Sequence, residues 1–265
     1  VWLSSAIQGS DVIKVVDDVM PPPPGLFNHL QTFLNESGFP PVFADIAPPT
    51  ATPVATPSGS EADRIGAAAE GSTVKVLGEA CGYLQEGSGF VVAPGLVVTN
   101  AHVVAGETAT EIVVDDLTYP ATPVLFDPKF DLAVLRTRAP LGPPLALDPD
   151  EAGRGTQGAV LGYPENGSLV VGPAGVASSL TAQGRDIYNQ GSVVRTVYQL
   201  DADVQPGNSG GPVVGADGTV IGVVFSRSTV DADVGYALAS PAVLARVQQA
   251  ESRSGPVSAG ACTQN

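Results

Sequence analysis

The length and composition of the chain limit the classes of protein to which it can belong. It has 265 residues, of which 43% are hydrophobic, so it can bury a sizeable core in one or two domains. Charged residues supply only 15%, and the 31 Gly and 24 Pro argue against coiled coils and favour short strands joined by turns. The formal net charge of −15 would repel a phosphate backbone, so we expect no nucleic-acid partner.

The first quarter of the chain differs in composition from the rest. Apolar residues at helical spacing predict two short helices, over 10–20 and 26–35. Residues 40–60 are largely Pro, Ala, Thr and Ser, a composition that cannot bury enough surface to fold alone. We interpret residues 1–66 as an extension, either a spacer or a segment laid over the surface of a domain formed by residues 67–265.

From residue 72 onward the pattern is one of strands and turns. Asp217-Gly218 between two apolar runs is a hairpin signal, and 241–250 is predicted as a closing helix. The fold class is therefore all-β, with two small barrels or a sandwich as its architecture. The runs predicted as strands are rich in β-branched residues and are bounded by Gly, Pro or Asp: 73–77, 89–93, 96–100, 111–114, 132–136, 158–162, 168–172, 193–200, 212–215, 219–225 and 235–238.

The cysteines and the hydropathy give a few further limits. Cys81 and Cys262 lie in no metal-binding or redox spacing, so the sequence predicts neither a metal site nor a cofactor. One disulfide and two buried thiols both remain open. No apolar run reaches the length of about 18 residues that a membrane span needs. Because the chain opens at Val1 rather than at a methionine, we expect it to be a piece of a longer protein.

A serine set among glycines is the strongest chemical signal in the sequence. Ser209 lies in Gly207-Asn208-Ser209-Gly210-Gly211, directly before an apolar run. A nucleophilic hydroxyl needs backbone N–H groups beside it to hold the oxyanion that forms on attack, and glycines permit the backbone conformations that aim those groups inward. The alternative is a Gly-rich turn that carries an ordinary serine.

A reactive serine requires a base, and this chain has two histidines. His29 lies in a predicted N-terminal helix, where we expect a surface or packing role. His102 follows an apolar strand, whose end can present a side chain rigidly. An imidazole acting as base needs a carboxylate partner, and Asp131 begins an apolar strand where an unpaired charge would be costly. Three other carboxylates lie among turn residues and are predicted to be solvated: Asp115, Asp116 and Asp127.

The order His102, Asp131, Ser209 is the chymotrypsin order. The sequence over roughly 72–250 resembles the HtrA branch of trypsin-like serine proteases. This resemblance implies a chymotrypsin-like double β-barrel and a serine endopeptidase that acts through an acyl-enzyme intermediate. Four motifs carry it: Gly87-Ser88-Gly89-Phe90, Thr99-Asn100-Ala101-His102, Asp131-Leu132-Ala133-Val134-Leu135 and Gly207-Asn208-Ser209-Gly210-Gly211-Pro212.

The resemblance also implies two sets of residues around the nucleophile. The backbone N–H groups of Gly207 and Ser209 would form the oxyanion hole. Phe225, Ser226 and Arg227 would form the strand edge that pairs with the substrate backbone by β-augmentation.

Asp203 stands six positions before the nucleophile, at the base of the substrate pocket in the resembled fold. A buried carboxylate there would favour Lys or Arg in the substrate, because a cationic side chain would neutralise it. Proteases of the HtrA type prefer small aliphatic residues instead. We therefore favour an aliphatic over a basic preference. Asp203 is kept as a candidate substrate-binding residue, with an outward orientation toward solvent as the alternative if the pocket loop is short.

A narrower resemblance rests on the Pro-rich extension, the acidic composition and the cysteine pair. Together they are similar to the periplasmic domain of the membrane-bound acid-resistance proteases of mycobacteria. This implies a Cys81–Cys262 disulfide in an oxidising extracytoplasmic compartment. It also implies transmembrane helices that precede Val1 in the longer protein, and a role in protection against acid or oxidative stress.

Two alternatives to a protease remain open at this point. A catalytically silent module could keep the fold and use it to capture peptides, although such modules usually lose a member of the triad. An esterase could use the same residues, because the acyl chemistry is shared.

Overall fold

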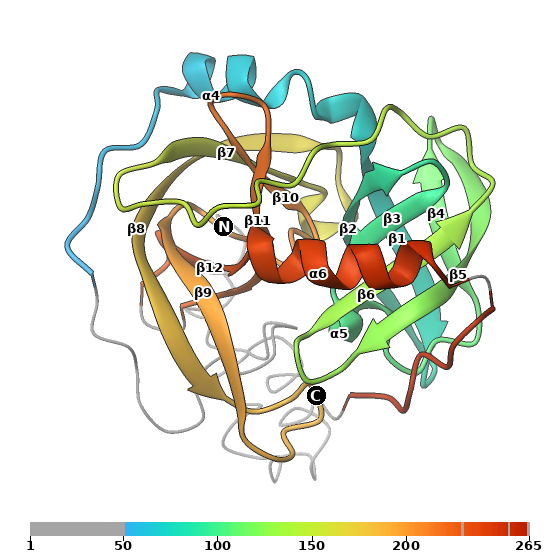
Figure 1. Ribbon diagram of the computed structural model, residues 1–265. Helices are drawn as coiled ribbons and strands as arrows, with labels where there is room; N and C mark the ends of the chain where they lie inside the picture. Colours follow the sequence, from blue (N-terminus) through green and yellow to red (C-terminus); the bar gives the residue numbers. More distant parts are fainter. Residues whose placement is uncertain (1–50, 229–230, 254, 264–265) are drawn as a thin grey trace, which may run out of the picture. The chain divides into compact units, whose positions relative to one another are not determined.

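The computed structural model describes residues 51–228, 231–253 and 255–263 and places their strands in two closed barrels (Figure 1). The predicted helices over 10–20 and 26–35, with His29, lie outside the described residues. The helical elements are α4 (Gly59–Gly66), η1 (Glu70–Ser72), α5 (Ala101–Val104), η2 (Pro164–Asn166) and α6 (Ser240–Glu251).

The first barrel contains six strands, in the order β1-β2-β3-β6-β5-β4. Every neighbouring pair is antiparallel, as hairpin-connected strands allow. Its interior is filled by β-branched and aliphatic side chains, among them Val76, Val97, Ile112 and Leu135. The strands are β1 (Thr73–Ala80), β2 (Tyr83–Ala93), β3 (Leu96–Thr99), β4 (Thr110–Val114), β5 (Leu117–Asp127) and β6 (Leu132–Thr137).

The second barrel repeats this design with the order β10-β11-β12-β9-β8-β7. Its strands are also antiparallel, and its interior holds Val160, Tyr198, Leu200 and Val224. The expectation of a double β-barrel is therefore confirmed. The strands are β7 (Gln157–Gly162), β8 (Val170–Gly184), β9 (Val193–Asp201), β10 (Pro212–Gly215), β11 (Val220–Arg227) and β12 (Val234–Ala239).

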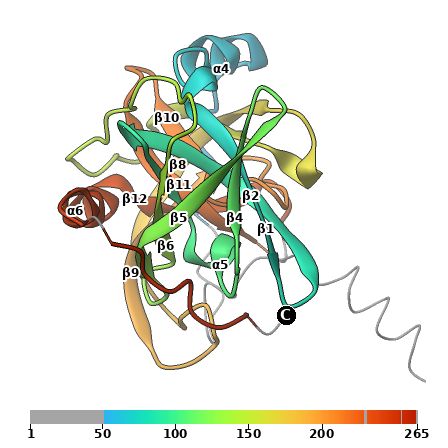
Figure 2. The ribbon, with the colours of Figure 1, turned by 90° about the vertical axis from the view of Figure 1, so that its right-hand side faces the viewer.

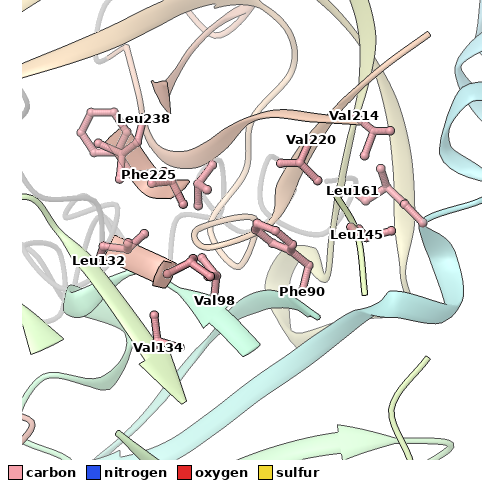
Figure 3. Packing of buried hydrophobic residues seen from close by; sticks show 14 of the residues in the cluster. Phe90, Val98, Leu132, Val134, Leu145, Leu161, Val214, Val220, Phe225 and Leu238 are labelled. Carbon is pink, nitrogen blue, oxygen red and sulfur yellow. The ribbon is translucent and has the colours of Figure 1, made fainter. Parts of the chain in front are cut away.

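A third cluster of apolar side chains joins the two barrels. It contains Phe90, Val98 and Leu132 from the first barrel together with Leu161 and Phe225 from the second, and all five are buried. Figure 3 shows these side chains facing one another across the junction. Burial of this cluster fixes the two barrels against each other, so a site at their junction has a rigid frame.

The closing helix forms where it was predicted. Helix α6 lies outside the barrels, where Figures 1 and 2 show it beside strands of both. Val243 and Val247 face the shared cluster. Arg246 lies 3.5 Å above the ring of Phe130 and forms a 2.8 Å ion pair with Asp127. Asp127 is therefore a half-buried, paired carboxylate rather than the solvated one expected from its turn sequence.

Strand β5 is the one barrel strand that the sequence pattern did not indicate. It carries Pro120 and Pro123, and proline normally lowers the expectation of a strand because it cannot donate to the ladder. The register shifts between Pro123 and Leu125, so the second proline is accommodated at an irregularity of the strand. Asp115 and Asp116 form the turn before this strand, and both have positive φ. Both side chains are exposed, which agrees with the prediction that they are solvated.

The described part of the Pro-rich segment lies against the second barrel. The Val54 N–H donates to Asp201, and Arg154 donates to the Thr52 carbonyl over 2.8 Å. Helix α4 then begins at Gly59, capped by the Ser58 hydroxyl, which accepts from the Glu61 N–H. Ser58 and Glu61 have the spacing of a capping box, which is a sequence signal for the start of a helix. The surrounding Pro-rich composition predicts an extended segment instead, so this helix was not expected. Residues 51–66 therefore lie on the surface of the domain, as in the second of the two interpretations, rather than forming a spacer.

Cys81 and Cys262 form a disulfide that spans 181 positions of the chain. Cys81 occupies the tight turn between β1 and β2, with a φ of 57°. The tail that carries Cys262 runs past the loop after α5, where the Gly106 N–H donates to the Ala259 carbonyl over 3.0 Å. The disulfide therefore holds the tail against the first barrel.

Loss of this disulfide should destabilise the protein substantially. Opening a loop of 181 positions raises the entropy of the unfolded chain, which corresponds to about 5 kcal/mol in the entropic model. We expect the midpoint of urea unfolding to fall when a reductant is present. The matched control is the double variant Cys81→Ala, Cys262→Ala. Its urea midpoint should be lower than that of the oxidised parent protein and should not change when the reductant is added. Equal midpoints for the oxidised and reduced parent protein would contradict this expectation.

Candidate active site

His102 and Asp131 form a buried pair at the edge of the first barrel. Asp131 Oδ2 lies 2.8 Å from His102 Nδ1, and the backbone N–H of His102 donates to Asp131 Oδ1 over 2.9 Å. The exposed fraction is 0% for Asp131 and 8% for His102. Because an ionised carboxylate only accepts hydrogen bonds, a neutral imidazole paired with it has its proton on Nδ1 and its lone pair on Nε2.

Local backbone geometry aims both side chains at each other. Asp131 has a φ of 65°, in the left-handed region, directly before β6. Its carbonyl accepts a 2.8 Å hydrogen bond from Asn100 Nδ2, at the end of the strand that leads into His102. His102 lies in the single turn α5, and its carbonyl accepts from Gln85 Nε2 over 2.8 Å. The geometry therefore depends on Asn100 and Gln85 as well as on the pair itself.

The second nitrogen of the imidazole is positioned to accept a proton. His102 Nε2 is buried, and it has no hydrogen-bond partner among the residues that the structure describes. In a neutral imidazole with its proton on Nδ1, such a nitrogen can act as a base.

Ser209 lies in a tight loop of the second barrel, between β9 and β10. Gly207 and Gly210, on either side of it, have φ values of 94° and 84°. A side chain at Gly207 would collide with the Tyr163 carbonyl, and one at Gly210 would collide with the Ser88 carbonyl. Both positions therefore require glycine for backbone conformation and for space. This is the role that the sequence predicted for the glycines around the serine.

The Ser209 loop is attached to the first barrel close to His102. The Ser88 N–H donates to the Ser209 carbonyl over 2.8 Å, and the Ser88 carbonyl accepts from the Thr99 hydroxyl over 2.7 Å. Thr99 ends β3, and α5 with His102 follows after a single residue. Ser209, with an exposed fraction of 4%, thus belongs to the same junction as the His102–Asp131 pair.

Two backbone donors beside the serine are unused. Within the described ranges, neither the Gly207 N–H nor the Ser209 N–H donates to a protein acceptor, although their neighbours do. The Asn208 N–H donates to the Gln205 carbonyl over 3.0 Å, and the Gly210 N–H to the Val224 carbonyl over 2.8 Å. Unused N–H groups that flank a serine can bind an anion that forms on a reacting carbonyl.

The segment predicted to pair with the substrate backbone lies at the end of β11 and consists of Phe225, Ser226 and Arg227. Phe225 is fully buried. In the β11–β12 ladder, Ser226 pairs with Tyr236 and Arg227 pairs with Gly235.

Asp203 is exposed and accepts a 3.0 Å hydrogen bond from Gln205 Nε2. Its neighbours Ala202 and Val204 are buried, and this alternation turns Asp203 outward. The buried, unpaired carboxylate that a preference for Lys or Arg would need is therefore absent at this position.

A buried arginine lies behind the pair and was not singled out from the sequence. Arg195 of β9 donates from Nε to the Lys129 carbonyl and from Nη2 to the Arg185 carbonyl, each over 2.8 Å. Burial lowers the pKa of Arg195, and the nearby carboxylate of Asp131 acts in the opposite direction. The second barrel thus places a cation near Asp131 and anchors the turn that precedes it. A strand arginine has no local sequence signal for this role, because its partners are far away in the chain.

Glu107 follows α5 and is held in an unusual environment. Its carboxyl lies over Gly78, and the Thr110 hydroxyl donates to Oε2 over 2.5 Å. Oε1 is buried without a partner among the described residues. Burial raises the pKa of Glu107 from 4.5 to about 7, and the Thr110 hydrogen bond offsets this only in part. Near neutral pH this carboxyl therefore binds a proton in the folded state that it would release in the unfolded state.

Glu107 should make the folded protein more stable in mild acid. Its folded pKa lies above its unfolded pKa, so the stabilising contribution is complete below about pH 4.5 and is lost as the pH rises through about 7. The difference corresponds to a free energy of unfolding on the order of 3 kcal/mol. We expect Glu107→Gln to remove this pH dependence from urea unfolding at about pH 5 and about pH 8. The exposed Glu111→Gln variant should keep it, and an identical pH dependence in parent and Glu107→Gln would contradict the assignment.

No helix among the described residues has the length and apolar character that a membrane crossing requires. The same part of the chain contains no cluster of His, Cys, Asp and Glu side chains that could hold a metal ion.

A double β-barrel with a buried His–Asp pair and a glycine-flanked serine at the junction of the barrels is the arrangement of trypsin-like serine peptidases. Comparison with known families agrees, because residues 87–223 match the trypsin-like peptidase domain. The chain belongs to this family.

Individual relatives narrow the placement within the family. The chain is 36% identical to the serine protease Rv3671c of Mycobacterium tuberculosis, over 98% of this chain and 66% of that protein. The crystal structure of the active form of this protease matches with a TM-score of 0.76, 36% identity and coverage of 83% of this chain and 100% of that one. The chain thus spans slightly less than two thirds of the curated relative.

Two HtrA-type relatives complete the comparison. A probable periplasmic serine endoprotease, DegP-like, of Chlamydia pneumoniae is 35% identical over 58% of this chain and 32% of that protein. The HtrA-type protease AlgW, solved with a tripeptide, is 26% identical, has a TM-score of 0.62, and covers 73% of this chain and 63% of its own. The resemblance to the HtrA branch and to the mycobacterial protease is confirmed.

Proposed function

We propose that this protein cleaves other proteins as a serine endopeptidase in which Ser209 is the nucleophile, His102 the general base and Asp131 its orienting carboxylate. The observation that carries this proposal is the buried 2.8 Å contact between His102 Nδ1 and Asp131 Oδ2. This contact fixes the tautomer and leaves Nε2 to accept a proton.

In the first step, the Ser209 oxygen attacks the scissile carbonyl carbon while its proton passes to His102 Nε2. The π electrons of the carbonyl move onto its oxygen, and the Gly207 and Ser209 N–H groups donate hydrogen bonds to the resulting oxyanion. The imidazolium, stabilised by Asp131, then returns the proton to the leaving amine as the peptide bond breaks. Water then attacks the acyl-enzyme while its proton passes to His102 Nε2. The imidazolium returns this proton to the Ser209 oxygen as the acyl C–O bond breaks and the acid product leaves.

The segment predicted to bind substrate lies at the end of strand β11. We propose that the segment from Phe225 to Arg227 aligns an extended peptide by main-chain hydrogen bonds, in the manner of an added strand. Asp203 is exposed and offers no buried carboxylate to a cationic side chain. The resemblance to proteases of the HtrA type supports a pocket that accepts small aliphatic residues before the scissile bond.

We further propose that the protein works outside the cytoplasm. The disulfide supports this location, since such bonds persist in oxidising compartments. The name of the DegP-like relative places that protein in the periplasm. The resemblance to the mycobacterial acid-resistance proteases extends the proposal to a membrane-anchored protein that acts in acid or oxidative stress.

Matched peptides that differ only at the residue before the scissile bond test activity and specificity together. We expect Leu or Val to be cleaved fastest, because no buried carboxylate is present at position 203 to bind a cation. Asp203→Ala should leave this ranking unchanged. Arg preferred tenfold over Leu would contradict the aliphatic pocket. Hydrolysis of a simple ester without any peptide cleavage would favour an esterase, and binding without turnover a silent module.

A further inference from the structure

The side chain of Ser88 makes contacts that the proposed triad and oxyanion donors do not explain. Ser88 lies in β2 of the first barrel and is fully buried. Its hydroxyl donates to the Gly207 carbonyl over 2.6 Å and accepts from the Tyr163 N–H over 2.9 Å. Gly207 and Tyr163 both belong to the second barrel side of the junction, so one hydroxyl connects the two barrels at the oxyanion loop.

The contact with Gly207 restrains a residue that could otherwise rotate. Gly207 has a φ of 94°. Because glycine has no Cβ, its backbone could also adopt other conformations unless neighbouring groups restrain it. The Gly207 N–H shares a planar trans peptide with the Pro206 carbonyl, and the two groups point in opposite directions. The Glu165 N–H holds that carbonyl over 2.8 Å, while Ser88 holds the carbonyl of the following peptide. The peptides on both sides of Gly207 are therefore clamped.

The backbone of Ser88 is itself fixed at this place. Its N–H donates to the Ser209 carbonyl, and its carbonyl accepts from the Thr99 hydroxyl. Gly162 lies against the hydroxyl, since a Cβ there would be 2.9 Å from Ser88 Oγ. A group held in so many directions acts as a rigid reference point for the Ser209 loop.

We propose that Ser88 is a positioning residue that holds Gly207 in the conformation in which its N–H receives the oxyanion. The inference rests on the proposed function. Ser88 touches no reacting atom, so its effect is on transition-state stabilisation rather than on substrate capture. Without the hydroxyl, the Gly207 carbonyl loses its donor and the Tyr163 N–H loses its acceptor. We expect kcat to fall by roughly 10²-fold with KM close to that of the parent enzyme.

The variant Ser88→Ala tests this inference, and Ser72→Ala is its matched control. Ser72 is also fully buried, and its hydroxyl also donates to a backbone carbonyl, that of Pro143, over 2.6 Å. Both variants should lose similar thermal stability. Only Ser88→Ala should lose kcat.

A second measurement separates oxyanion binding from general damage. A peptide aldehyde forms a hemiacetal with Ser209, in which the aldehyde oxygen occupies the oxyanion position. Its affinity should fall in Ser88→Ala by the same factor as kcat/KM, while the affinity of a product peptide that forms no covalent bond stays unchanged. Ser88→Cys, which keeps approximately the volume and a weak S–H donor, should show a partial loss. This variant also serves if the alanine protein does not fold.

Three results would overturn the inference: an unchanged kcat in folded Ser88→Ala, a change confined to KM, or an equal loss of kcat in Ser72→Ala. Turnover by Ser209→Ala would overturn the proposed function, and this inference with it. An inactive Ser209→Ala protein beside a fully active Ser88→Ala protein would overturn the inference alone.

Discussion

Replacing Ser209 by alanine should abolish turnover and leave the fold intact. Removal of a triad nucleophile costs on the order of 10⁶ in kcat, because no other group can form the acyl-enzyme. The serine side chain is small, and within the described part of the chain it forms no hydrogen bond that holds its loop. Backbone contacts hold the loop instead, such as that between the Ser88 N–H and the Ser209 carbonyl. We therefore expect unchanged circular dichroism and an unchanged unfolding midpoint.

The measurement is cleavage of casein by the purified variant. His102→Ala should lose activity to a similar extent, because the base and the nucleophile act as a unit. A Ser209→Ala protein that retains a tenth of the parent rate would show that Ser209 is not the nucleophile.

The second large effect is expected for Asp131→Asn. The amide has nearly the shape of the carboxylate, but its NH₂ group can donate to His102 Nδ1, which moves the imidazole proton to Nε2. The base then has no lone pair facing the serine, and kcat should fall by about 10⁴. Asp131→Ala should lose somewhat less than Ser209→Ala.

Asp127→Asn provides the control for Asp131→Asn. Asp127 lies in the same turn and pairs with Arg246 rather than with the imidazole. Its replacement should lower stability modestly and leave kcat near the parent value. Equal losses of kcat in the two variants would mean that the turn as a whole, and not the tautomer of His102, limits the rate.

The fold could be predicted from the sequence where local signals agree with the final structure. The run over 212–215 became β10 (Pro212–Gly215), and Asp217-Gly218 turns the chain into β11, with Gly218 at a φ of 84°. Strand β5 could not be predicted, since Pro123 is tolerated only through an irregularity in the register that depends on β6. Helix α4 was not predicted, because the Pro-rich composition before it indicates an extended segment and its local helix signal is limited to the Ser58 cap.

The candidate site was predictable to the extent that it depends on rare residue types. The chain has only two histidines, and His102 is the one that follows an apolar strand, so it is predictable as the base. Asp131 is predictable as its partner because it is the acid at the head of an apolar run. Ser88 and Arg195 were not given a role, because their partners lie on strands and loops far away in the sequence. Asp203 shows the reverse case: its position suggested a pocket floor, while the burial of its neighbours turns it to solvent.

The most direct test of the account is to identify the residue that a fluorophosphonate probe modifies. Such a probe reacts only with a serine that is activated by a neighbouring base and faces an oxyanion hole. After incubation and digestion, mass spectrometry should find one adduct, on the peptide that contains Ser209, and none in the His102→Ala variant. An adduct on another serine, or no adduct in a folded protein that cleaves peptides, would contradict the account.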